Sequence, residues 1–247
     1  MTRTAIITGG SRGIGAATAK ILAGQGYAVE ILYREREETA QHVAQEIHRS
    51  GGTARTHRID VGDEQQVQRF VAGLEHEDAE VAVLVNNAGV AGNSLLLGTS
   101  LASWQHTLTT NLTGPFMMAR AVVPLMLDRG AGSIINISSN SAHLPGSGQG
   151  AYAASKGGIE ALTRAWAVEL RRKNIRVNCV RPGRVRTDMS EASADHLNAM
   201  SPAPWGEPKD LAEVIAFLTS DAARYINGQV LCADGGLSIT RPQAGTP

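Results

Sequence analysis

A tyrosine and a lysine stand four residues apart in the run YAASK, as Tyr152 and Lys156. Side chains four positions apart share one face of a helix, so the phenol and the ammonium group can approach each other. A ketone that accepts a hydride develops negative charge on its oxygen and needs a proton, which a phenol can donate. In the reverse direction the phenol needs a pKa about three units below its usual 10 to act as a base at neutral pH. One cation about 4 Å away supplies a comparable energy at an effective dielectric of about 20, so Lys156 is predicted to lower the pKa of Tyr152.

Further polar residues follow the predicted strands. Ser138 and Ser139 come directly after one β-branched run, Asn86 to Gly89 forms NNAG at the end of another, and Asn111 lies in the next helical segment. The Ser139 hydroxyl can hydrogen-bond a carbonyl oxygen and hold it beside the phenol, where charge develops. Because ligands bind at the carboxyl ends of the strands in an open parallel sheet, these residues are predicted to meet there.

The first predicted strand runs into the glycine-rich turn TGGSRGIG, from Thr8 to Gly15, and then into a helix. Gly9, Gly13 and Gly15 allow a tight turn and a close approach between the main chain and a ligand. The helix N-terminus adds unpaired N–H groups and a partial positive charge, which suit a pyrophosphate. The spacing differs from the common G-x-G-x-x-G fingerprint, and a plain tight turn is the alternative interpretation.

The same turn contains a G-x-S-x-G sequence centred on Ser11, the pattern of the nucleophile elbow of hydrolases. A hydrolase would need an acid and a histidine at later strand ends, and its elbow normally follows several strands. Ser11 follows the first strand, which disfavours this alternative.

The residues after the second predicted strand bear on which dinucleotide is bound. Proteins that prefer NAD place an acidic residue there for the ribose 2′-hydroxyl, whereas a nearby arginine accommodates the 2′-phosphate of NADP. Here the strand ends in Tyr33 and Arg34, and Arg12 of the turn adds a second cation on the same side. Glu35 argues the other way, and solvated surface arginines are the alternative. The pattern predicts NADP(H) in preference to NAD(H).

The elements that must position these residues alternate along the chain. β-branched runs predict strands at 4–8, 29–33, 54–59, 81–86, 133–137, 176–180 and 229–233. Apolar residues three or four apart predict helices at 14–25, 37–50, 64–75, 101–127, 151–172 and 211–220. This alternation is typical of an α/β fold, a doubly wound (Rossmann) domain whose parallel sheet of seven strands is flanked by helices on both faces. Gly114 and Pro115 are expected to loosen the long helix just after Asn111.

One domain is predicted over residues 1–240, followed by a mobile tail at 241–247. Within it, 187–208 shows no clear element and contains Met189 and Trp205. Such a segment is typical of a lid over a ligand, and a surface loop anchored by its apolar residues is the alternative.

Composition excludes several classes of protein. The 247 residues hold 23 Lys plus Arg against 23 Asp plus Glu, so no net charge attracts nucleic acid or an anionic membrane. The apolar runs are too short to span a bilayer and the N-terminus lacks the apolar stretch of a secretory signal, which predicts a cytoplasmic protein. Cys179 and Cys232 lie in predicted strands and are expected to be buried thiols. The histidines show no spacing of metal ligands, so no metal is expected.

From Thr8 to Gly236 the chain resembles the short-chain dehydrogenase/reductase family, and within it the 3-oxoacyl-(acyl-carrier-protein) reductase type. TGGSRGIG matches the family's T-G-x-x-x-G-x-G turn, Asp60-Val61 its adenine contact, and NNAG its sheet-supporting segment. The residues that match its catalytic tetrad are Asn111, Ser139, Tyr152 and Lys156. Ser139 is chosen over Ser138 because the family's serine lies thirteen residues before its tyrosine. The residues that match the segment holding the nicotinamide are Asn178, Pro182, Gly183 and Thr187.

The resemblance implies a role for each of these residues. Lys156 grips the nicotinamide ribose and, together with the charge of an oxidised nicotinamide, perturbs Tyr152, while Asn111 holds a water that relays protons. The implied cofactor-binding residues are Gly9, Ser11, Arg12, Gly13, Ile14, Gly15, Tyr33, Arg34, Asp60, Val61, Asn87, Ala88, Gly89, Tyr152, Lys156, Pro182, Gly183, Val185 and Thr187. The implied substrate-binding residues are Ser139, His143, Gln149, Tyr152 and Met189. Arg181, where a small or apolar residue is usual, and a rather short lid depart from the family pattern and bear on the substrate.

These observations predict NADPH-dependent reduction of a ketone to a secondary alcohol, with a 3-oxoacyl thioester as the leading substrate. One alternative is a dehydrogenase or reductase of a free alcohol, a sugar or a polycyclic ketone. Another is a dinucleotide-sensing protein without turnover, which the intact tetrad disfavours. Further candidates for the pocket wall are Asn93, Ser94, Leu95, Leu144, Pro145 and Trp205.

The sequence also suggests protein partners. A basic group, consisting of Arg129, Arg171, Arg172 and Lys173, is a candidate docking surface for an acidic acyl carrier protein, although charges at helix ends also complement the helix dipole. The family resemblance implies a homotetramer that pairs the helices after strands four and five and the last strand.

Overall fold

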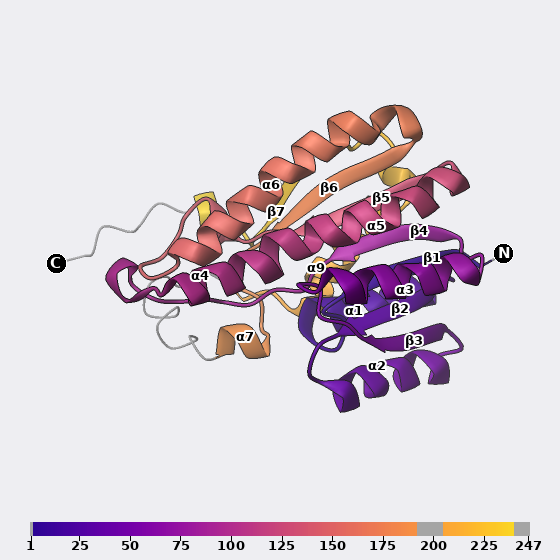
Figure 1. Cartoon of the computed structure of the whole chain (residues 1–247), viewed down its shortest axis with the longest axis horizontal. Helices are drawn as coiled ribbons and strands as arrows, with labels where there is room; N and C mark the ends of the chain where they lie inside the picture. Colours follow the sequence, from indigo (N-terminus) through magenta and orange to yellow (C-terminus); the bar gives the residue numbers. More distant parts are fainter. Residues whose placement is uncertain (1, 192–204, 240–247) are drawn as a thin grey trace.

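The computed structural model describes residues 2–191 and 205–239. One sheet of seven parallel strands has the order β3-β2-β1-β4-β5-β6-β7 (Figure 1). The strands are β1 Thr4–Thr8, β2 Ala28–Tyr33, β3 Thr53–Arg58, β4 Val81–Asn86, β5 Gly132–Ile137, β6 Ile175–Pro182 and β7 Val230–Ala233. The order of the strands reverses between β1 and β4, and a sheet of this kind binds ligands where its order reverses. The predicted strands are confirmed, two of them with the same ends and five with ends shifted by one or two residues.

Helices cover both faces of the sheet. They are α1 Gly13–Gly24, α2 Glu37–Arg49, α3 Glu64–His76, α4 Leu101–Leu108, α5 Gly114–Arg129, α6 Gly150–Leu170, α7 Asp188–Glu191 and α9 Pro208–Thr219. Successive side chains of a strand point to opposite faces, so Ile7 packs into a core with residues of α1, α2 and α9. Ile6 packs into the second core, with residues of α3, α5 and α6. The predicted doubly wound α/β fold is confirmed.

The helix predicted over 101–127 is interrupted, so the prediction of one continuous helix is wrong. A π-helical turn, Thr109–Thr113, separates α4 from α5. Pro115 lacks an N–H group to continue the α-helical pattern, and Gly114 allows α5 to approach the chain after β3. A Cβ at Gly114 would lie only 2.9 Å from Cγ2 of Val61. The expected loosening is therefore present, and the wide turn directs Asn111 inward, where it is buried.

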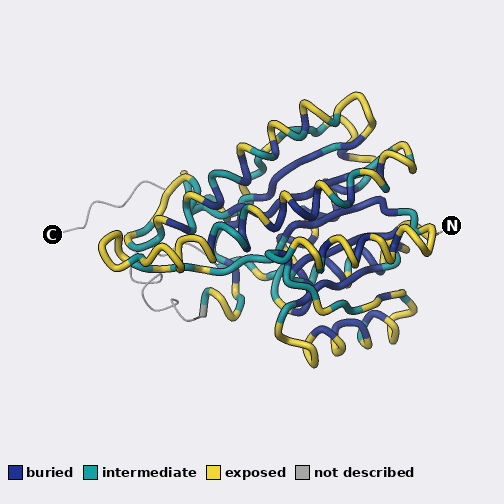
Figure 2. The backbone as a smooth tube through the Cα atoms, viewed as in Figure 1, coloured by how far each residue is buried: buried dark blue, intermediate teal, exposed yellow. Residues whose placement is uncertain are grey.

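Burial decreases from the centre of the sheet to its edges (Figure 2). β1 and β4 are buried along their whole length, whereas β3 and β7 carry exposed residues. Cys179, in β6, is buried as expected, but Cys232 is exposed, so the expectation of two buried thiols is wrong. The reason is that β7 forms one edge of the sheet. In the part of the chain that the structure describes, no helix is long and apolar enough to cross a membrane.

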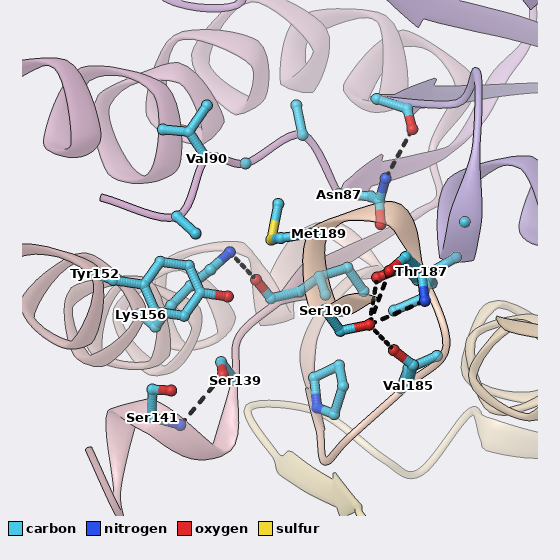
Figure 3. Close-up of a pocket in the computed structure, with 18 of the residues that line it drawn as sticks. Asn87, Val90, Ser139, Ser141, Tyr152, Lys156, Val185, Thr187, Met189 and Ser190 are labelled. Carbon is cyan, nitrogen blue, oxygen red and sulfur yellow. Dashed lines mark hydrogen bonds between the residues drawn. The ribbon is translucent and has the colours of Figure 1, made fainter. Parts of the chain in front are cut away.

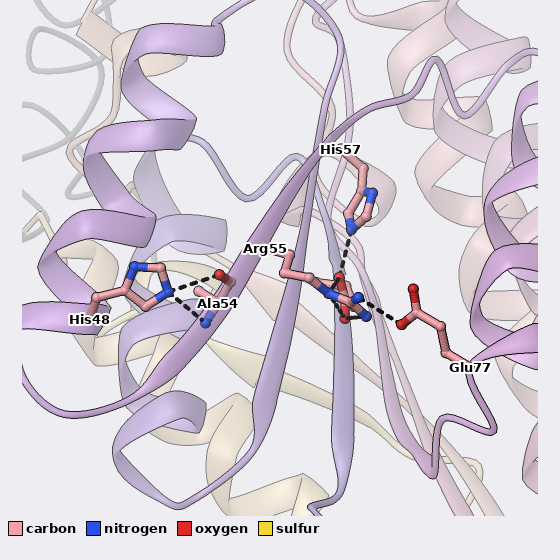
Figure 4. Close-up of polar contacts among 6 residues, drawn as sticks. His48, Ala54, Arg55, His57 and Glu77 are labelled. Atoms are coloured by element: carbon pink, nitrogen blue, oxygen red, sulfur yellow. Dashed lines mark hydrogen bonds and ion pairs between the residues drawn. The ribbon is translucent and has the colours of Figure 1, made fainter.

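A cluster of charged residues joins the edge strand β3 to β2 (Figure 4). Glu30, on β2, is only 1% exposed, and its carboxylate lies 2.6 Å from both Arg55 and His57 of β3. Arg55 also pairs with Glu77, at 2.6 Å. Burial works to raise the pKa of Glu30, but hydrogen bonds with His57 and Arg55 outweigh it and lower the pKa. The cluster therefore holds β3 in place through a buried charge that depends on its partners.

Candidate active site

A crevice of about 1660 Å³ opens at the carboxyl ends of the central strands. It is lined by every residue predicted to bind cofactor or substrate or to act in catalysis, except Gly15 and Asn111. Asn93, Leu144 and Pro145 also line it, whereas Ser94, Leu95 and Trp205 do not. Trp205 instead lines a separate cavity of about 480 Å³ near the end of β7. The prediction for the pocket wall is therefore wrong for these three residues.

The glycine turn after β1 is closely packed against the end of β4. Gly9 has a φ of +64°, and a Cβ there would lie 2.9 Å from Cα of Ala88. The Asn87 amide donates to the carbonyl oxygens of Thr8 and Gly9, both at 3.0 Å. Gly15 lies behind the crevice, since a Cβ there would meet the Gly9 oxygen at 2.3 Å. The turn thus leaves its outer side open to a ligand, and Gly15 serves packing.

α1 begins directly after this turn. Arg12 occupies its N-cap, and the Arg12 side chain pairs with Asp188 instead of capping the helix. The first N–H groups of α1 are therefore not capped by this side chain, and Gly13 and Ile14 line the crevice, where a helix N-terminus suits an anion. A pyrophosphate fits this cradle by its charge and by the close approach that the glycines allow.

Tyr152 and Lys156 lie on one face of α6 and both line the crevice (Figure 3). The Lys156 Nζ atom donates to the carbonyl oxygen of Ile137 at 2.8 Å and lies 5.7 Å from the centre of the Tyr152 ring. Ser139 follows β5, and its Oγ accepts a hydrogen bond from the Ser141 N–H at 3.2 Å. Three predicted residues from two elements thus converge in one place.

Burial acts on both titratable groups of this site. It raises the pKa of Tyr152, opposed by a hydrogen bond with Ser139, and it lowers the pKa of Lys156 to about 8. In the protein's own residues the pKa of Tyr152 is therefore raised, and its lowering by Lys156 together with an oxidised nicotinamide stays a prediction. Tyr152 remains protonated at neutral pH, which is the state that can donate a proton to a ketone.

Asn111 lies behind the crevice and is 1% exposed. Its Oδ1 accepts from the Val90 N–H at 2.8 Å, and its Nδ2 donates to the Val90 oxygen at 2.9 Å and to Ser155 Oγ at 3.1 Å. A Cβ at Gly89 would lie 3.3 Å from Asn111 Oδ1 and 3.5 Å from Lys156 Nζ, so this glycine allows both to approach. The Asn111 side chain thus holds the crevice wall, and a water relay through its main-chain carbonyl stays a prediction.

A buried ion pair behind Ser139 was not predicted. Glu160 is 6% exposed, and Arg181 donates to both of its carboxylate oxygens, at 2.8 and 2.7 Å. The Ser138 hydroxyl donates to the same carboxylate at 2.7 Å. Glu160 lies four residues after Lys156, so helical spacing places it on the same face of α6. Arg181, the departure from the family pattern, is therefore the partner of a buried carboxylate.

A residue that follows the last strand of the sheet also contacts the turn that carries Ser139. Asn140, directly after Ser139, donates to the Asp234 carboxylate at 2.8 Å. Asp234 follows β7, the last strand of the sheet. The contact fixes the short turn that carries Ser139.

The segment after β6 begins with a set of local hydrogen bonds. Ser190 Oγ accepts from the Thr187 N–H at 3.0 Å and donates to the Val185 oxygen at 2.6 Å (Figure 3). A parallel bridge between Val185 and Gly206 brings its two ends together. Most of the predicted lid, namely 192–204, and the predicted tail lie outside the described residues.

The arginines predicted to favour NADP line the crevice together. Arg12 and Arg34 are joined there by Arg36, which sequence reasoning missed because it lies in a run of mixed charges before α2. Arg12 pairs with Asp188 and Arg34 with Glu35, at 2.7 and 2.6 Å. In the described part of the chain, no group of three or more His, Cys, Asp or Glu is arranged to hold a metal ion.

The basic group predicted as a docking surface lies at the end of the sheet opposite the crevice of the same chain. Arg129 ends α5 before β5 begins, and Arg171 to Lys173 follow α6 before β6 begins. The crevice lies at the opposite ends of these strands, and a strand the length of β6 spans roughly 26 Å. Docking of an acyl carrier protein at this group stays a prediction.

A family model described as "Enoyl-(Acyl carrier protein) reductase" matches residues 9–238. With this match and the relatives below, the chain belongs to the short-chain dehydrogenase/reductase family. A 3-oxoacyl-(acyl-carrier-protein) reductase from Synechocystis sp. is 39% identical over 238 residues, covering 95% of this chain and 96% of that protein. One from Staphylococcus aureus is 36% identical over 242 residues, covering 96% and 98%. The resemblance found in the sequence is confirmed.

Solved structures share the whole fold. A proposed gluconate dehydrogenase from Agrobacterium tumefaciens is 35% identical, with a TM-score of 0.92 and 97% of each chain covered. A proposed NAD(P)-dependent gluconate 5-dehydrogenase from Beutenbergia cavernae, with NADP bound at low occupancy, is 36% identical. Its TM-score is 0.90, and the match covers 96% of this chain and 97% of that one.

Proposed function

We propose that this protein reduces a ketone to a secondary alcohol with NADPH, and that the substrate is a 3-oxoacyl thioester. The observation that carries the proposal is the convergence of Tyr152, Lys156 and Ser139 in a crevice that begins at a glycine-rich turn. The relatives named 3-oxoacyl-(acyl-carrier-protein) reductases, at 36–39% identity over nearly the whole chain, support the substrate class.

The residues present fit an NADP(H) cofactor. The glycine turn and the start of α1 would hold the pyrophosphate, Asp60 and Val61 the adenine, and Lys156 the nicotinamide ribose. Arg12, Arg34 and Arg36 line the same crevice and supply positive charge for a 2′-phosphate. When bound, the reduced nicotinamide supplies the hydride.

The proton and the orientation of the ketone come from the chain itself. Ser139 Oγ binds the carbonyl oxygen and directs it toward the phenol of Tyr152. Tyr152, protonated at neutral pH, donates its hydroxyl proton to that oxygen as the negative charge develops. Lys156 lies close enough to stabilise the resulting phenolate, although its ammonium is held mainly by the Ile137 carbonyl. His143, Gln149 and Met189 line the crevice beside this point and would contact the acyl chain.

A second candidate is the oxidation or reduction of a sugar acid. The proposed gluconate dehydrogenases among the solved structures, at 35–36% identity, favour it. Both candidates use the same proton donor, so the difference lies in the crevice wall. The described wall contains the apolar residues Leu144, Pro145 and Met189, which favour an acyl chain over a polyol.

The test is a panel of substrates with the purified protein. Oxidation of NADPH should be fastest with a 3-oxoacyl thioester and close to background with a 2-enoyl thioester or 5-ketogluconate. With NADH in place of NADPH, the 3-oxoacyl thioester should be reduced more slowly. Tyr152→Phe should lose this activity and still bind 2′,5′-ADP. If 5-ketogluconate is reduced faster than the thioester, the substrate is a sugar acid and the thioester proposal fails. If the enoyl thioester is reduced, the enzyme acts on a carbon–carbon double bond and the proposal of ketone reduction fails.

The remaining expectations about partners belong to the same proposal. We propose that the acyl group arrives on an acyl carrier protein, which a comparison of carrier-bound and free thioesters would test. We also propose a homotetramer, since Phe116 on α5 and Val168 on α6 are exposed at 40% and 63%. A monomer in light scattering would refute this. The cytoplasmic location expected from the sequence stays a prediction.

A further inference from the structure

The carboxylate of Asp188, the first residue of α7, lies between two arginines. Its Oδ2 atom is 2.7 Å from Nη1 of Arg12 and 3.4 Å from Nη1 of Arg36. Arg12 belongs to the turn after β1, and Arg36 to the turn between β2 and α2. All three residues line the crevice. The contact therefore crosses from the segment after β6 to the two turns assigned to the phosphates and the ribose.

The main chain holds Asp188 at this place. A Cβ on Gly13, next to Arg12, would lie 3.1 Å from the Thr187 methyl carbon, so the two segments touch. The Thr187 N–H is held by Ser190 Oγ at 3.0 Å. The Asp188 side chain itself is 51% exposed, so its carboxylate can rotate into solvent while its backbone stays in place.

Arg12, Arg34 and Arg36 already have acidic partners. A hydrogen bond from Arg12 and the nearby charge of Arg36 lower the pKa of Asp188, so its carboxylate is charged at neutral pH. Arg34 pairs with Glu35 at 2.6 Å. A 2′-phosphate needs the same donors and has the same sign of charge as these carboxylates, whereas a 2′-hydroxyl carries no charge. An acidic residue at this place therefore discriminates between the two dinucleotides.

We propose that Asp188 sets the selectivity between NADPH and NADH, because its carboxylate competes with the 2′-phosphate for Arg12 and Arg36. The inference rests on the proposed function, since it assumes that the crevice binds an NADP(H) cofactor. The 2′-phosphate gains both arginines only when the carboxylate turns away. Asp188 thus reduces the advantage that the arginines give to NADPH, and NADH binding leaves the Asp188 contacts intact.

Direct binding of 2′,5′-ADP and 5′-AMP, measured by calorimetry, tests this without catalysis. Asp188→Asn should bind 2′,5′-ADP about two- to fivefold more tightly, a change in the range of one exposed ion pair. Its affinity for 5′-AMP should change less than about twofold, as expected for a ligand without the 2′-phosphate. Arg36→Gln should lower the affinity for 2′,5′-ADP about tenfold and have little effect on the affinity for 5′-AMP.

Glu46→Gln is the matched control. Glu46 lies on α2 and pairs with Lys20 of α1 at 2.8 Å, and neither residue lines the crevice. The control removes one negative charge, as Asp188→Asn does, and should leave both affinities unchanged. A gain of 2′,5′-ADP affinity in both variants would attribute the effect to net charge and overturn the inference.

The other outcomes separate the inference from the proposed function. If Asp188→Asn binds 2′,5′-ADP no more tightly than the wild type, or gains equally for 5′-AMP, the inference fails and the proposed function stands. If the wild type binds 2′,5′-ADP no better than 5′-AMP and oxidises NADPH no faster than NADH, the NADP preference of the proposed function fails, and the inference fails as well.

Discussion

Replacing Arg181 with leucine removes the two hydrogen bonds, at 2.8 and 2.7 Å, that it donates to the buried Glu160 carboxylate. Removing one partner of a buried ion pair costs about 3–5 kcal/mol, because a buried charge is left uncompensated. The Arg181 side chain is 19% exposed and that of Glu160 8%, so the lower end applies. Arg181→Leu should therefore lose about 3 kcal/mol of unfolding free energy at pH 7, measured by urea denaturation.

Two further variants separate the pair from its surroundings. Glu160→Leu/Arg181→Leu removes both charges and should lie within about 1 kcal/mol of the wild type, because an apolar pair can replace a buried ion pair. Lys20→Leu breaks the half-exposed pair with Glu46 and should cost less than about 1 kcal/mol. If Arg181→Leu costs no more than Lys20→Leu, the charge of Glu160 is not held by Arg181 and the reasoning fails.

The pH dependence gives an independent check. Burial works to raise the pKa of Glu160, and hydrogen bonds from Arg181 and Ser138 outweigh it, so the folded pKa is lowered. The stability that this provides is present above the unfolded pKa and is lost as the pH falls through the folded value. In Arg181→Leu, burial is opposed only by the Ser138 hydrogen bond and the charge of Arg164, so the folded pKa of Glu160 is higher than in the wild type. The difference in unfolding free energy between the wild type and Arg181→Leu should therefore narrow from pH 7 to pH 4.5. A difference that widens over this range would contradict the reasoning.

The other predictions concern the site and the sheet. Tyr152→Phe should lower kcat for ketone reduction by about 10²–10⁴-fold in steady-state assays, with unchanged binding of 2′,5′-ADP. Since burial lowers the pKa of Lys156 to about 8, its folded form loses a proton before its unfolded form does. Relative to Lys156→Met, the unfolding free energy of the wild type should therefore rise between pH 8 and pH 10, and a flat difference would contradict the low pKa. Glu30→Gln should lose about 2 kcal/mol at neutral pH by urea denaturation and match the wild type below its lowered folded pKa, because the stability of a depressed carboxyl is lost there. Gly15→Ala places a Cβ 2.3 Å from the Gly9 oxygen and should lower both the melting temperature and 2′,5′-ADP affinity, unlike Gly24→Ala, where the Cβ meets open space.

Local patterns predicted most of the fold and the members of the site. Alternation of strands and helices placed the sheet, and the spacing of Tyr152 and Lys156 predicted their shared face, because these features depend on a few neighbouring residues. The motif in TGGSRGIG predicted the turn for the same reason. The prediction of one continuous helix over 101–127 was wrong, because the apolar spacing does not distinguish an α-helix from a helix with a π-turn. The close contact between Gly114 and Val61 is visible only in the folded structure.

Contacts between distant segments could not be predicted. Asp188 and Arg12 are 176 residues apart, and nothing in either run indicates a pair. The exposure of Cys232 depends on its strand lying at the edge of the sheet, which a single apolar run does not reveal. The direction of the Tyr152 pKa shift depends on how deeply the phenol is buried, and spacing along a helix carries no information on depth.

The hydrogen bond between Asn140 and Asp234 has a consequence for biosynthesis. Asp234 follows the last strand of the sheet, 94 residues after Asn140, so a ribosome must deliver all seven strands before the turn that carries Ser139 gains this anchor. A nascent chain therefore gains this anchor only after its final strand has been synthesised, and premature termination before that strand removes the anchor along with the strand.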